Sequence, residues 1–404
     1  MLTHRLPFPP DRGDRIRSFH LLKLLARHFD LAVACTSDEP VRNEQRDALA
    51  AMAQRVAITP ISRRYSRLRG VAAMLAGRAA TPAAFFRPSL ARTIQRWDER
   101  EPFDAILTFC TGMIDYARLL TCSRRPGSPV PVHILDLVDV DSMKWLAYAR
   151  QSRQPLRWVY SAESRRLRAI EAGCFDRFDA ITFVSHAEAE AYRQHVGERP
   201  HLHIVTNGVD LDYFQPLPDA DTRRLVFIGV LDYRPNVDGI EWFVEHVMPP
   251  LRCRVAGARL SIVGRNPTRR VLELRHRDGV DVVGSVDDVR VHLRQAAAVI
   301  APLRIARGMQ NKVLEAMAAA RAVVCSPAAF EGIDAVAGRD LLVGTEPQHW
   351  ANTLERVLTE ASYRQMIARS ARRRVEQGCD WDRCLEPMIG LLSGQGPATY
   401  RAAG

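Results

Sequence analysis

Short apolar runs alternate along the chain with longer stretches in which apolar residues recur at helical spacing. This alternation is typical of buried parallel strands joined by helices. The predicted strands are residues 31–35, 105–109, 132–135, 180–184, 224–228, 259–263, 280–283 and 297–300. The predicted helices include residues 16–28, 156–171, 236–246, 267–276, 287–296, 310–319 and 381–392.

The strand–helix pattern occurs twice, so we predict two Rossmann-like, doubly wound α/β domains in series. A chain of 404 residues is long enough for both. The boundary is expected in the polar stretch 210–222, which contains Pro216 and Pro218. Ligands of such sheets bind at the carboxyl ends of the strands, so the two domains are expected to face each other across a cleft. About five residues precede Pro7, so either the first strand is short or the true start lies upstream.

The net charge is +11, and only Lys23, Lys144 and Lys312 among the 57 basic residues are lysines. An arginine bias of this kind is typical of a GC-rich genome. Because basic residues are not interleaved with aromatic ones and no reading helix is evident, we expect no nucleic-acid partner. No apolar run reaches the ~18 residues of a membrane span, and residues 1–5 lack a signal-peptide core. We therefore expect a cytoplasmic protein with reduced cysteines.

The strongest chemical motif lies in residues 301–318, where a strand leads through a loop to a helix beginning near Met309. Free N–H groups at a helix start suit a diphosphate, and Gly308 allows the backbone to approach the ligand closely. Lys312 and Glu315 are three residues apart and share a helix face. Lys312 is expected to reach a phosphate and Glu315 to accept from ribose hydroxyls. The alternative is a surface ion pair on an ordinary helix.

A second candidate cluster follows the strand at 132–135 and contains Asp136, Asp139 and Asp141. Their position after a strand places them at the expected cleft. Asp139 or Asp141 is predicted to deprotonate an acceptor or to bind a sugar. Two alternatives stay open: Asp139 and Asp141 hold a divalent metal under a diphosphate, or they cap the following helix.

The first loop, residues 9–17, leads into a helix starting near Asp14. Gly13 is expected to tighten the turn, and Arg15 or Arg17 to reach inward toward a phosphate or an acceptor. The alternative is a plain strand-to-helix turn with a solvated face. Later in the chain, Ser185 and Glu188 have the spacing of a capping box.

These motifs together resemble the retaining GT-B glycosyltransferases of family 4, whose donor motif is usually a Glu, seven residues and a second Glu. Glu315 matches the second Glu, whereas Arg307 stands at the position of the first. Residues 206–214 resemble the interdomain signature of that family, residues 227–236 its next strand and loop, and residues 9–17 its first glycine loop.

More narrowly, residues 9–17, 136–142 and 233–238 resemble sugar transferases associated with bacterial exopolysaccharide and exosortase systems. The resemblance implies a GT-B fold with domains at 1–205 and 206–380 and a segment, 381–404, that returns to the first domain. It also implies transfer with retention from a nucleotide-diphosphate sugar to a lipid-linked or saccharide acceptor, without a metal or other cofactor.

The family carries an Arg just after its Phe-x-Gly glycine and a Lys shortly after, where this chain has Val230 and Arg234. Lys312, Arg304 and Arg234 are expected to meet the charge of the departing diphosphate instead. If they do not, the chain is a degenerate nucleotide-sugar binding protein; a GT-B nucleotide-sugar epimerase is the other alternative. The expected donor site comprises Gly229, Arg234, Arg304, Gly308, Met309, Gln310, Asn311, Lys312 and Glu315. The expected catalytic residues are Asp139, Asp141 and Lys312.

Residues 63–96 contain eight arginines and no acidic residue, together with apolar side chains such as Leu75 and Phe85. A basic helix with an apolar face suits an anionic membrane surface, where a lipid-linked acceptor would lie. This pattern predicts peripheral association with the inner face of the cell membrane. A solvated face on an arginine-rich protein is the alternative.

Overall fold

The computed structural model describes residues 1–11, 13–122, 130–174, 176–197, 201–220, 222–305 and 308–394. The chain divides into two compact units. Met1–Thr206 and the segment from Leu385 form the first unit, and Asn207–Cys384 forms the second.

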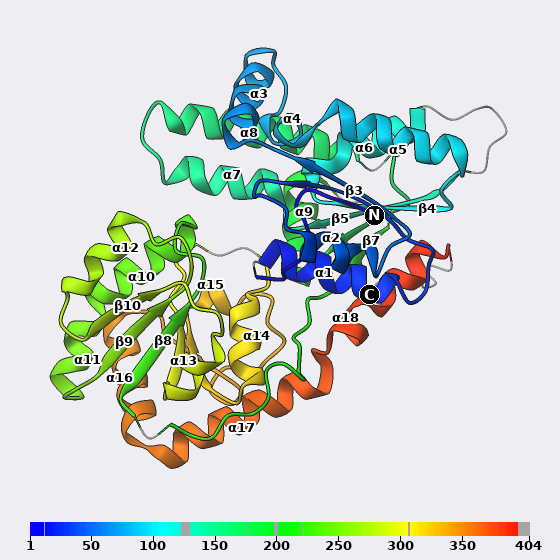
Figure 1. Cartoon of the computed structure of the whole chain (residues 1–404). Helices are drawn as coiled ribbons and strands as arrows, with labels where there is room; N and C mark the ends of the chain where they lie inside the picture. The colour runs from blue at the N-terminus through cyan, green and yellow to red at the C-terminus, as the bar shows by residue number, and fades with distance from the viewer. Residues whose placement is uncertain are drawn as a thin grey trace. The chain divides into compact units, whose positions relative to one another are not determined.

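Within its described residues, the first unit contains a seven-stranded parallel sheet in the order β3-β2-β1-β4-β5-β6-β7 (Figure 1). The strands are β1 (Leu2–Thr3), β2 (Ala32–Ser37), β3 (Arg55–Pro60), β4 (Ala105–Phe109), β5 (Val132–Val138), β6 (Ala180–Phe183) and β7 (Leu202–Ile204). The helices are α1 (Gly13–Leu25), α2 (Asn43–Ala50), α3 (Arg63–Leu75), α4 (Ala80–Phe85), α5 (Pro88–Arg100), α6 (Ile114–Cys122), α7 (Asp141–Arg150), α8 (Leu156–Gly173) and α9 (His186–Val196). A short 3₁₀ helix, η1 (Thr111–Met113), follows β4.

In the described part of the second unit, a six-stranded parallel sheet has the order β10-β9-β8-β11-β12-β13. The strands are β8 (Arg224–Ile228), β9 (Arg259–Val263), β10 (Val280–Gly284), β11 (Ala298–Ala301), β12 (Ala322–Cys325) and β13 (Leu342–Val343). The helices are α10 (Arg234–His246), α11 (Met248–Arg254), α12 (Arg269–Glu273), η2 (Leu274–His276), α13 (Arg290–Gln295), α14 (Asn311–Ala318), α15 (Pro327–Phe330), α16 (Pro347–Thr359) and α17 (Ala361–Gly378). The last helix, α18 (Trp381–Leu392), begins in the second unit and continues into the first.

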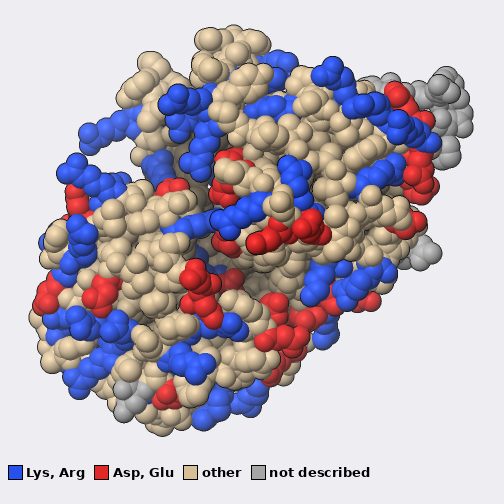
Figure 2. All heavy atoms as spheres, viewed as in Figure 1, with Lys and Arg blue, Asp and Glu red and all other residues tan. Residues whose placement is uncertain are grey.

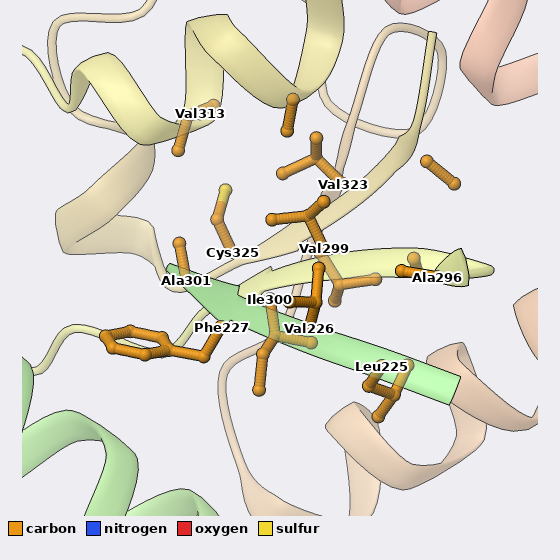
Figure 3. Close-up of a cluster of buried hydrophobic side chains, with 14 of the residues drawn as sticks. Leu225, Val226, Phe227, Ala296, Val299, Ile300, Ala301, Val313, Val323 and Cys325 are labelled. Carbon is orange, nitrogen blue, oxygen red and sulfur yellow. The ribbon is translucent and has the colours of Figure 1, made fainter. Parts of the chain in front are cut away.

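The core of the second unit fixes α14 against the ends of the central strands. Figure 3 shows Val313 of α14 pointing toward Ala301 of β11 and Cys325 of β12. All three side chains are buried, as are Val226 and Val299 in the strands beneath. Because buried side chains pack densely, this contact holds the first turn of α14 in one position relative to the strand ends.

The two parallel sheets with interleaved helices confirm the predicted α/β fold, and the strands at 105–109, 224–228 and 259–263 have the predicted bounds. Four strands besides β1 were not predicted. The edge strands β3 and β7 are only half-buried, so they show no continuous apolar run. The four residues of β12 follow almost directly on the alanines of α14, and β13 has two residues, so neither forms a separate hydrophobic period.

Candidate functional site

The strand order of the second unit reverses between β8 and β11, because the chain runs outward from β8 through β9 and β10 and then returns to the opposite side of β8. In open parallel sheets, ligands bind at this switch point, beyond the carboxyl ends of the strands. Gly229 follows β8 at this edge, and the loop leading to α14 follows β11. The sheet topology thus brings the predicted donor residues Gly229 and Lys312 to one edge.

The side chains of Lys312 and Asn236 and the carbonyl of Val230 meet at the end of β8. The ammonium of Lys312 donates to Oδ1 of Asn236 at 2.6 Å, and Nδ2 of Asn236 donates to the carbonyl of Val230 at 2.8 Å. A Cβ at Gly229 would lie 2.8 Å from Nδ2 of Asn236 and 3.1 Å from Nζ of Lys312. Only glycine therefore leaves room for this arrangement. Asn236 lies in the motif at residues 233–238, but the sequence predicts no role for it.

Lys312 is held as a cation in a partly apolar setting. Its Nζ lies 4.9 Å from the centre of the Phe227 ring, a contact in which the ring face attracts the charge. Burial lowers the pKa of Lys312 from 10.5 to about 8, while the nearby Glu315 acts in the opposite direction. The ammonium is therefore protonated at neutral pH, and its hydrogen bond to Asn236 leaves its charge uncompensated by a direct carboxylate contact.

Glu315 lies one turn further along α14 and is half-buried. Burial raises its pKa to about 7, with Lys312 opposing the shift. Among the described residues, its carboxylate makes no hydrogen bond. The group is thus available to accept hydrogen bonds from a ligand hydroxyl, as the sequence predicted for a ribose.

The start of α14 differs from the prediction. The helix begins at Asn311 and not near Met309, and Gln310 precedes it without making a side-chain cap. The N–H of Val313 donates to the carbonyl of Gln310 at 2.9 Å. No side chain of a described residue caps the preceding N–H groups of Asn311 and Lys312, so they are available to an anion. Gly308 has φ +67°, a conformation that glycine adopts without strain.

The other predicted donor residues have separate environments. Met309 packs against the core, and Nε2 of Gln310 donates to the carbonyl of Gly308 at 3.3 Å. Oδ1 of Asn311 accepts from Asn207 at 2.9 Å. Arg304 is 55% exposed and lies 3.9 Å from Asp238. Arg234 is the half-buried first residue of α10. Arg307, which stands at the position of the first Glu of the family motif, lies outside the described residues.

In the first unit, the strand order reverses between β1 and β4. Asp136 lies in the neighbouring strand β5, between β4 and β6. Its carboxylate accepts from Nε of Arg17 at 2.8 Å, from Nη2 of Arg17 at 3.1 Å and from Thr182 at 2.9 Å. Arg17 also donates to the carbonyl of Thr206 at 3.3 Å. Arg17 thus reaches inward, and its guanidinium forms a buried bidentate ion pair that positions β5 against α1.

Arg15 and Asp14 of the first loop also make ion pairs within the protein. Arg15 is 1% exposed, and its guanidinium contacts Asp11 at 3.2 Å and Glu39 at 2.9 Å. Asp14 pairs with Arg5 at 2.8 Å and lies 3.3 Å from His4. Gly13 is the first residue of α1, and a Cβ there would meet no atom within 4 Å. The fold therefore does not require a glycine here for a tight turn.

The loop between β5 and α7 presents Asp139 at the same edge of the sheet. Among the described residues, the Asp139 carboxylate makes no hydrogen bond, and burial, Glu188 and Asp141 together raise its pKa to about 7 against the effects of Lys144 and Arg17. Val138, directly before it, has φ +68°, a conformation that strains a β-branched residue. Such strain is concentrated at functional sites in proteins.

Asp141 differs from Asp139 because its carboxylate is already engaged. It accepts a hydrogen bond from Thr111 of η1 and lies 3.8 Å from the ammonium of Lys144. Cys110, which joins β4 to η1, has φ +67°. Sequence periodicity did not indicate Cys110 or Thr111, because neither belongs to a motif.

Two buried glutamates hold the β5–α7 loop in place. Glu171 of α8 accepts from the N–H of Ser142 at 2.9 Å and from its hydroxyl, and Glu188 of α9 accepts from the N–H of Val140 at 2.8 Å. Ser185 caps α9 as predicted, accepting from the N–H of Glu188. The carboxylate of Glu188, expected to close a capping box, thus reaches the neighbouring loop.

Neither unit offers an evident metal centre in its described part. No group of three or more His, Cys, Asp or Glu side chains is arranged there to hold a metal ion. Among the same described residues, no helix is both long and apolar enough to span a membrane.

Two family models match successive parts of the chain. Residues 17–213 match the model described as glycosyltransferase family 4, and residues 222–360 match the model described as glycosyl transferases group 1. The first match covers β2 to β7 of the first unit and the first seven residues of the second, and the second match lies within the second unit. No curated protein sequence matches the chain.

Solved structures share the architecture over nearly the whole length. The sucrose-phosphate synthase of Thermosynechococcus elongatus has a TM-score of 0.71 at 17% identity, covering 97% of this chain and 98% of that one. HepE of Anabaena in complex with UDP-glucose has a TM-score of 0.66 at 14% identity, with coverage of 97% and 98%. WaaG, a glycosyltransferase involved in lipopolysaccharide biosynthesis, has a TM-score of 0.66 at 15% identity, covering 97% of this chain and 99% of that one. The chain is a glycosyltransferase of the GT-B type, with a family 4 domain followed by a group 1 domain.

Proposed function

We propose that the protein transfers a sugar, with retention of anomeric configuration, from a nucleoside-diphosphate sugar to a saccharide or lipid-linked acceptor in exopolysaccharide synthesis. The observation that carries the proposal is the Lys312–Asn236 pair beside Gly229, at the switch point of the second unit. A cation at the carboxyl edge of such a sheet is suited to a diphosphate.

The donor half of the reaction follows from α14. The ammonium of Lys312 and the first N–H groups of the helix would stabilise the negative charge that develops on the departing diphosphate. Glu315, one turn later, would accept from the ribose hydroxyls. Because Lys312 and the helix start supply positive charge without a metal, we propose that no divalent ion is required. The solved structures of HepE with UDP and with UDP-glucose make UDP-glucose the first donor to test.

The acceptor half is assigned to the β5–α7 loop. Asp139, with a pKa of about 7 and no hydrogen bond from a described residue, would accept the proton or the hydrogen bond of the attacking hydroxyl. Asp141, bonded to Thr111, would orient the loop and contact the acceptor sugar. Glu171 and Glu188 would position both carboxylates without touching substrate.

Peripheral contact with an anionic membrane is proposed for α3. Its exposed apolar side chains are Tyr65, Leu68, Val71 and Leu75, which is 85% exposed. Arg64 and Arg67 are exposed beside them and have no ion-pair partner among the described residues. In Figure 2 the outer tip of the α3–α4 segment shows uncharged side chains, with basic ones beside it. Apolar and cationic groups together suit the boundary of anionic lipids, on the cytoplasmic side in this proposal.

The proposal is tested by a thermal-shift screen across UDP, GDP, ADP and their sugars, followed by product analysis with the stabilising donor. Formation of a glycosylated acceptor demonstrates sugar transfer. Nuclear magnetic resonance of this product gives its anomeric configuration. An inverted product would refute retention. A changed donor sugar without acceptor would support a nucleotide-sugar epimerase. Binding without turnover of any donor would support the degenerate binding protein that Val230 suggests.

A further inference from the structure

A pocket of about 470 Å³ lies on the first unit, and neither Asp139 nor Asp141 lines it. Residues from three helices line it. They are Leu146 of α7, Trp158, Ser161, Ser164, Arg165 and Arg168 of α8, and His195 of α9. Pockets of this volume are large enough for a small ligand or for the head group of a lipid.

The polar side of the pocket carries uncompensated positive charge. Arg165 and Arg168 are exposed, lie one turn apart on α8 and make no hydrogen bond or ion pair with a described residue. The acidic residues of α8 cannot neutralise them, because both are buried and engaged: Glu163 accepts from the N–H groups of Ala80 and Thr81, and Glu171 binds Ser142. Two guanidinium groups at this spacing suit a phosphate.

The apolar side chains that line the pocket are Leu146 and Trp158. Trp158 is 69% exposed, and the neighbouring Leu156 and Val159 are 51% and 39% exposed in the same first turn of α8. Exposed large apolar side chains next to a cationic cluster indicate a ligand that is itself part apolar. The hydroxyl of Ser161, between Trp158 and Arg165, makes no hydrogen bond with a described residue. It is available as a donor to a phosphate oxygen.

The pocket is also linked to the proposed acceptor loop. Ser164, one of its lining residues, donates to the carbonyl of Ser142 at 2.8 Å, and Ser142 follows Asp141 directly. An occupant of the pocket would thus contact the layer of side chains that supports the acceptor loop.

We propose that this pocket binds the phosphate of a membrane lipid, with Arg165, Arg168 and Ser161 on the phosphate and Trp158 against the adjoining hydrocarbon. Binding here would place a lipid-linked acceptor close to the loop that carries Asp139. This biological role rests on the proposed transfer function, whereas the binding itself is independent of it.

The test uses short-chain lipids as dissolved monomers, so that no membrane surface contributes. Binding of dihexanoyl phosphatidic acid, dihexanoyl phosphatidylcholine and inorganic phosphate is measured by titration calorimetry on the full chain. We expect phosphatidic acid to bind more tightly than either other probe. Replacing both Arg165→Gln and Arg168→Gln should weaken its binding at least about tenfold, and Trp158→Ala should weaken binding of the lipid but not of inorganic phosphate.

Arg157→Gln is the matched control, because Arg157 is an exposed arginine of α8 that does not line the pocket. Equal binding of phosphatidic acid to the wild type and to the double arginine variant would overturn the inference. So would inorganic phosphate binding as tightly as the lipid. Nucleotide-sugar binding and turnover, measured on the same samples, separate the two proposals: a wild type that transfers sugar but binds no phosphatidic acid refutes only the pocket.

Discussion

The ammonium of Lys312 lies 2.6 Å from Oδ1 of Asn236, so the first turn of α14 is joined to the first turn of α10 at the end of β8. The partner is a neutral amide and not a carboxylate. The hydrogen bond therefore fixes the position of the lysine while leaving its charge for a ligand. This arrangement makes Lys312 the most informative residue to replace.

Lys312→Ala is expected to reduce turnover at least about tenfold, which corresponds to about 1.4 kcal/mol of transition-state stabilisation. The melting temperature of the ligand-free protein should stay the same or rise. The reason is that burial lowers the pKa of Lys312 to about 8, so the protonated side chain disfavours the folded state at neutral pH. Lys312→Arg should restore part of the turnover. The exposed Lys23 provides the control Lys23→Ala, and wild-type turnover in Lys312→Ala would contradict the assignment.

Glu315→Ala is expected to weaken nucleotide binding by about 10- to 150-fold, the loss of a charged hydrogen bond worth about 1.5–3 kcal/mol. Nucleotide affinity of the wild type should rise from pH 6 to pH 7, because the pKa of Glu315 is raised to about 7 and only the carboxylate is a full acceptor. Above this range Lys312, whose pKa is about 8, loses its charge and opposes the rise. Glu315→Gln should remove the rise from pH 6 to pH 7. Calorimetric titration measures both effects, with Glu331→Gln, at an exposed site of the same unit, as control.

Glu171→Gln is expected to make stability less dependent on pH. Burial raises the pKa of Glu171 from 4.5 to about 8, so the folded state holds more protons than the unfolded state between these values. Stability contributed by this group therefore falls as pH rises from about 4.5 to about 8. Melting temperatures at pH 5 and pH 8 should differ less in the variant than in the wild type. An identical difference in both would disprove the prediction, and the exposed Glu190→Gln is the control.

Activity is expected to withstand EDTA. The positive charge at the donor site comes from Lys312 and the start of α14, and in the described residues Asp141 is engaged by Thr111 and not in a cluster of metal ligands. Turnover measured with and without EDTA checks this. Loss of activity that Mn²⁺ or Mg²⁺ restores would instead favour the metal-binding interpretation of Asp139 and Asp141.

Binding to anionic liposomes is expected to weaken as salt rises, because the screening length falls from about 10 Å at 0.1 M to about 3 Å at 1 M. Arg64→Gln with Arg67→Gln should reduce it further. Arg69 is left unchanged because its guanidinium donates to the carbonyl of Ala83 at 3.2 Å and supports α4. Sedimentation with vesicles measures the effect.

The control for this experiment is Arg275→Gln with Arg277→Gln, an exposed basic pair in the second unit. It removes the same net charge without changing α3. Equal loss of binding in the two double variants would show that net charge alone, and not α3, mediates the contact. Equal binding to neutral and anionic vesicles would refute the proposed contact of α3 with an anionic membrane.

The sequence by itself determined the alternation of strands and helices, because buried strands and amphipathic helices each impose a local period of apolar residues. It also placed Lys312 and Glu315 on one face of a helix after a strand, since three residues separate them. Gly308 was indicated by its place in the loop between the strand and the helix. Its φ of +67° is a conformation that favours glycine.

Only the tertiary structure decided which groups these residues meet. Arg17 and Asp136 are 119 residues apart, and Lys312 and Asn236 are 76 apart. Both pairs form because the order of the strands brings distant segments to one sheet edge, and periodicity carries no information about strand order. The same holds for Glu171, whose buried carboxylate fastens the loop at Ser142. A side chain that the sequence offers to a ligand can therefore find a partner that only the folded sheet supplies. Arg17 pairs with a carboxylate, whereas Lys312 bonds to a neutral amide and keeps its charge for a ligand.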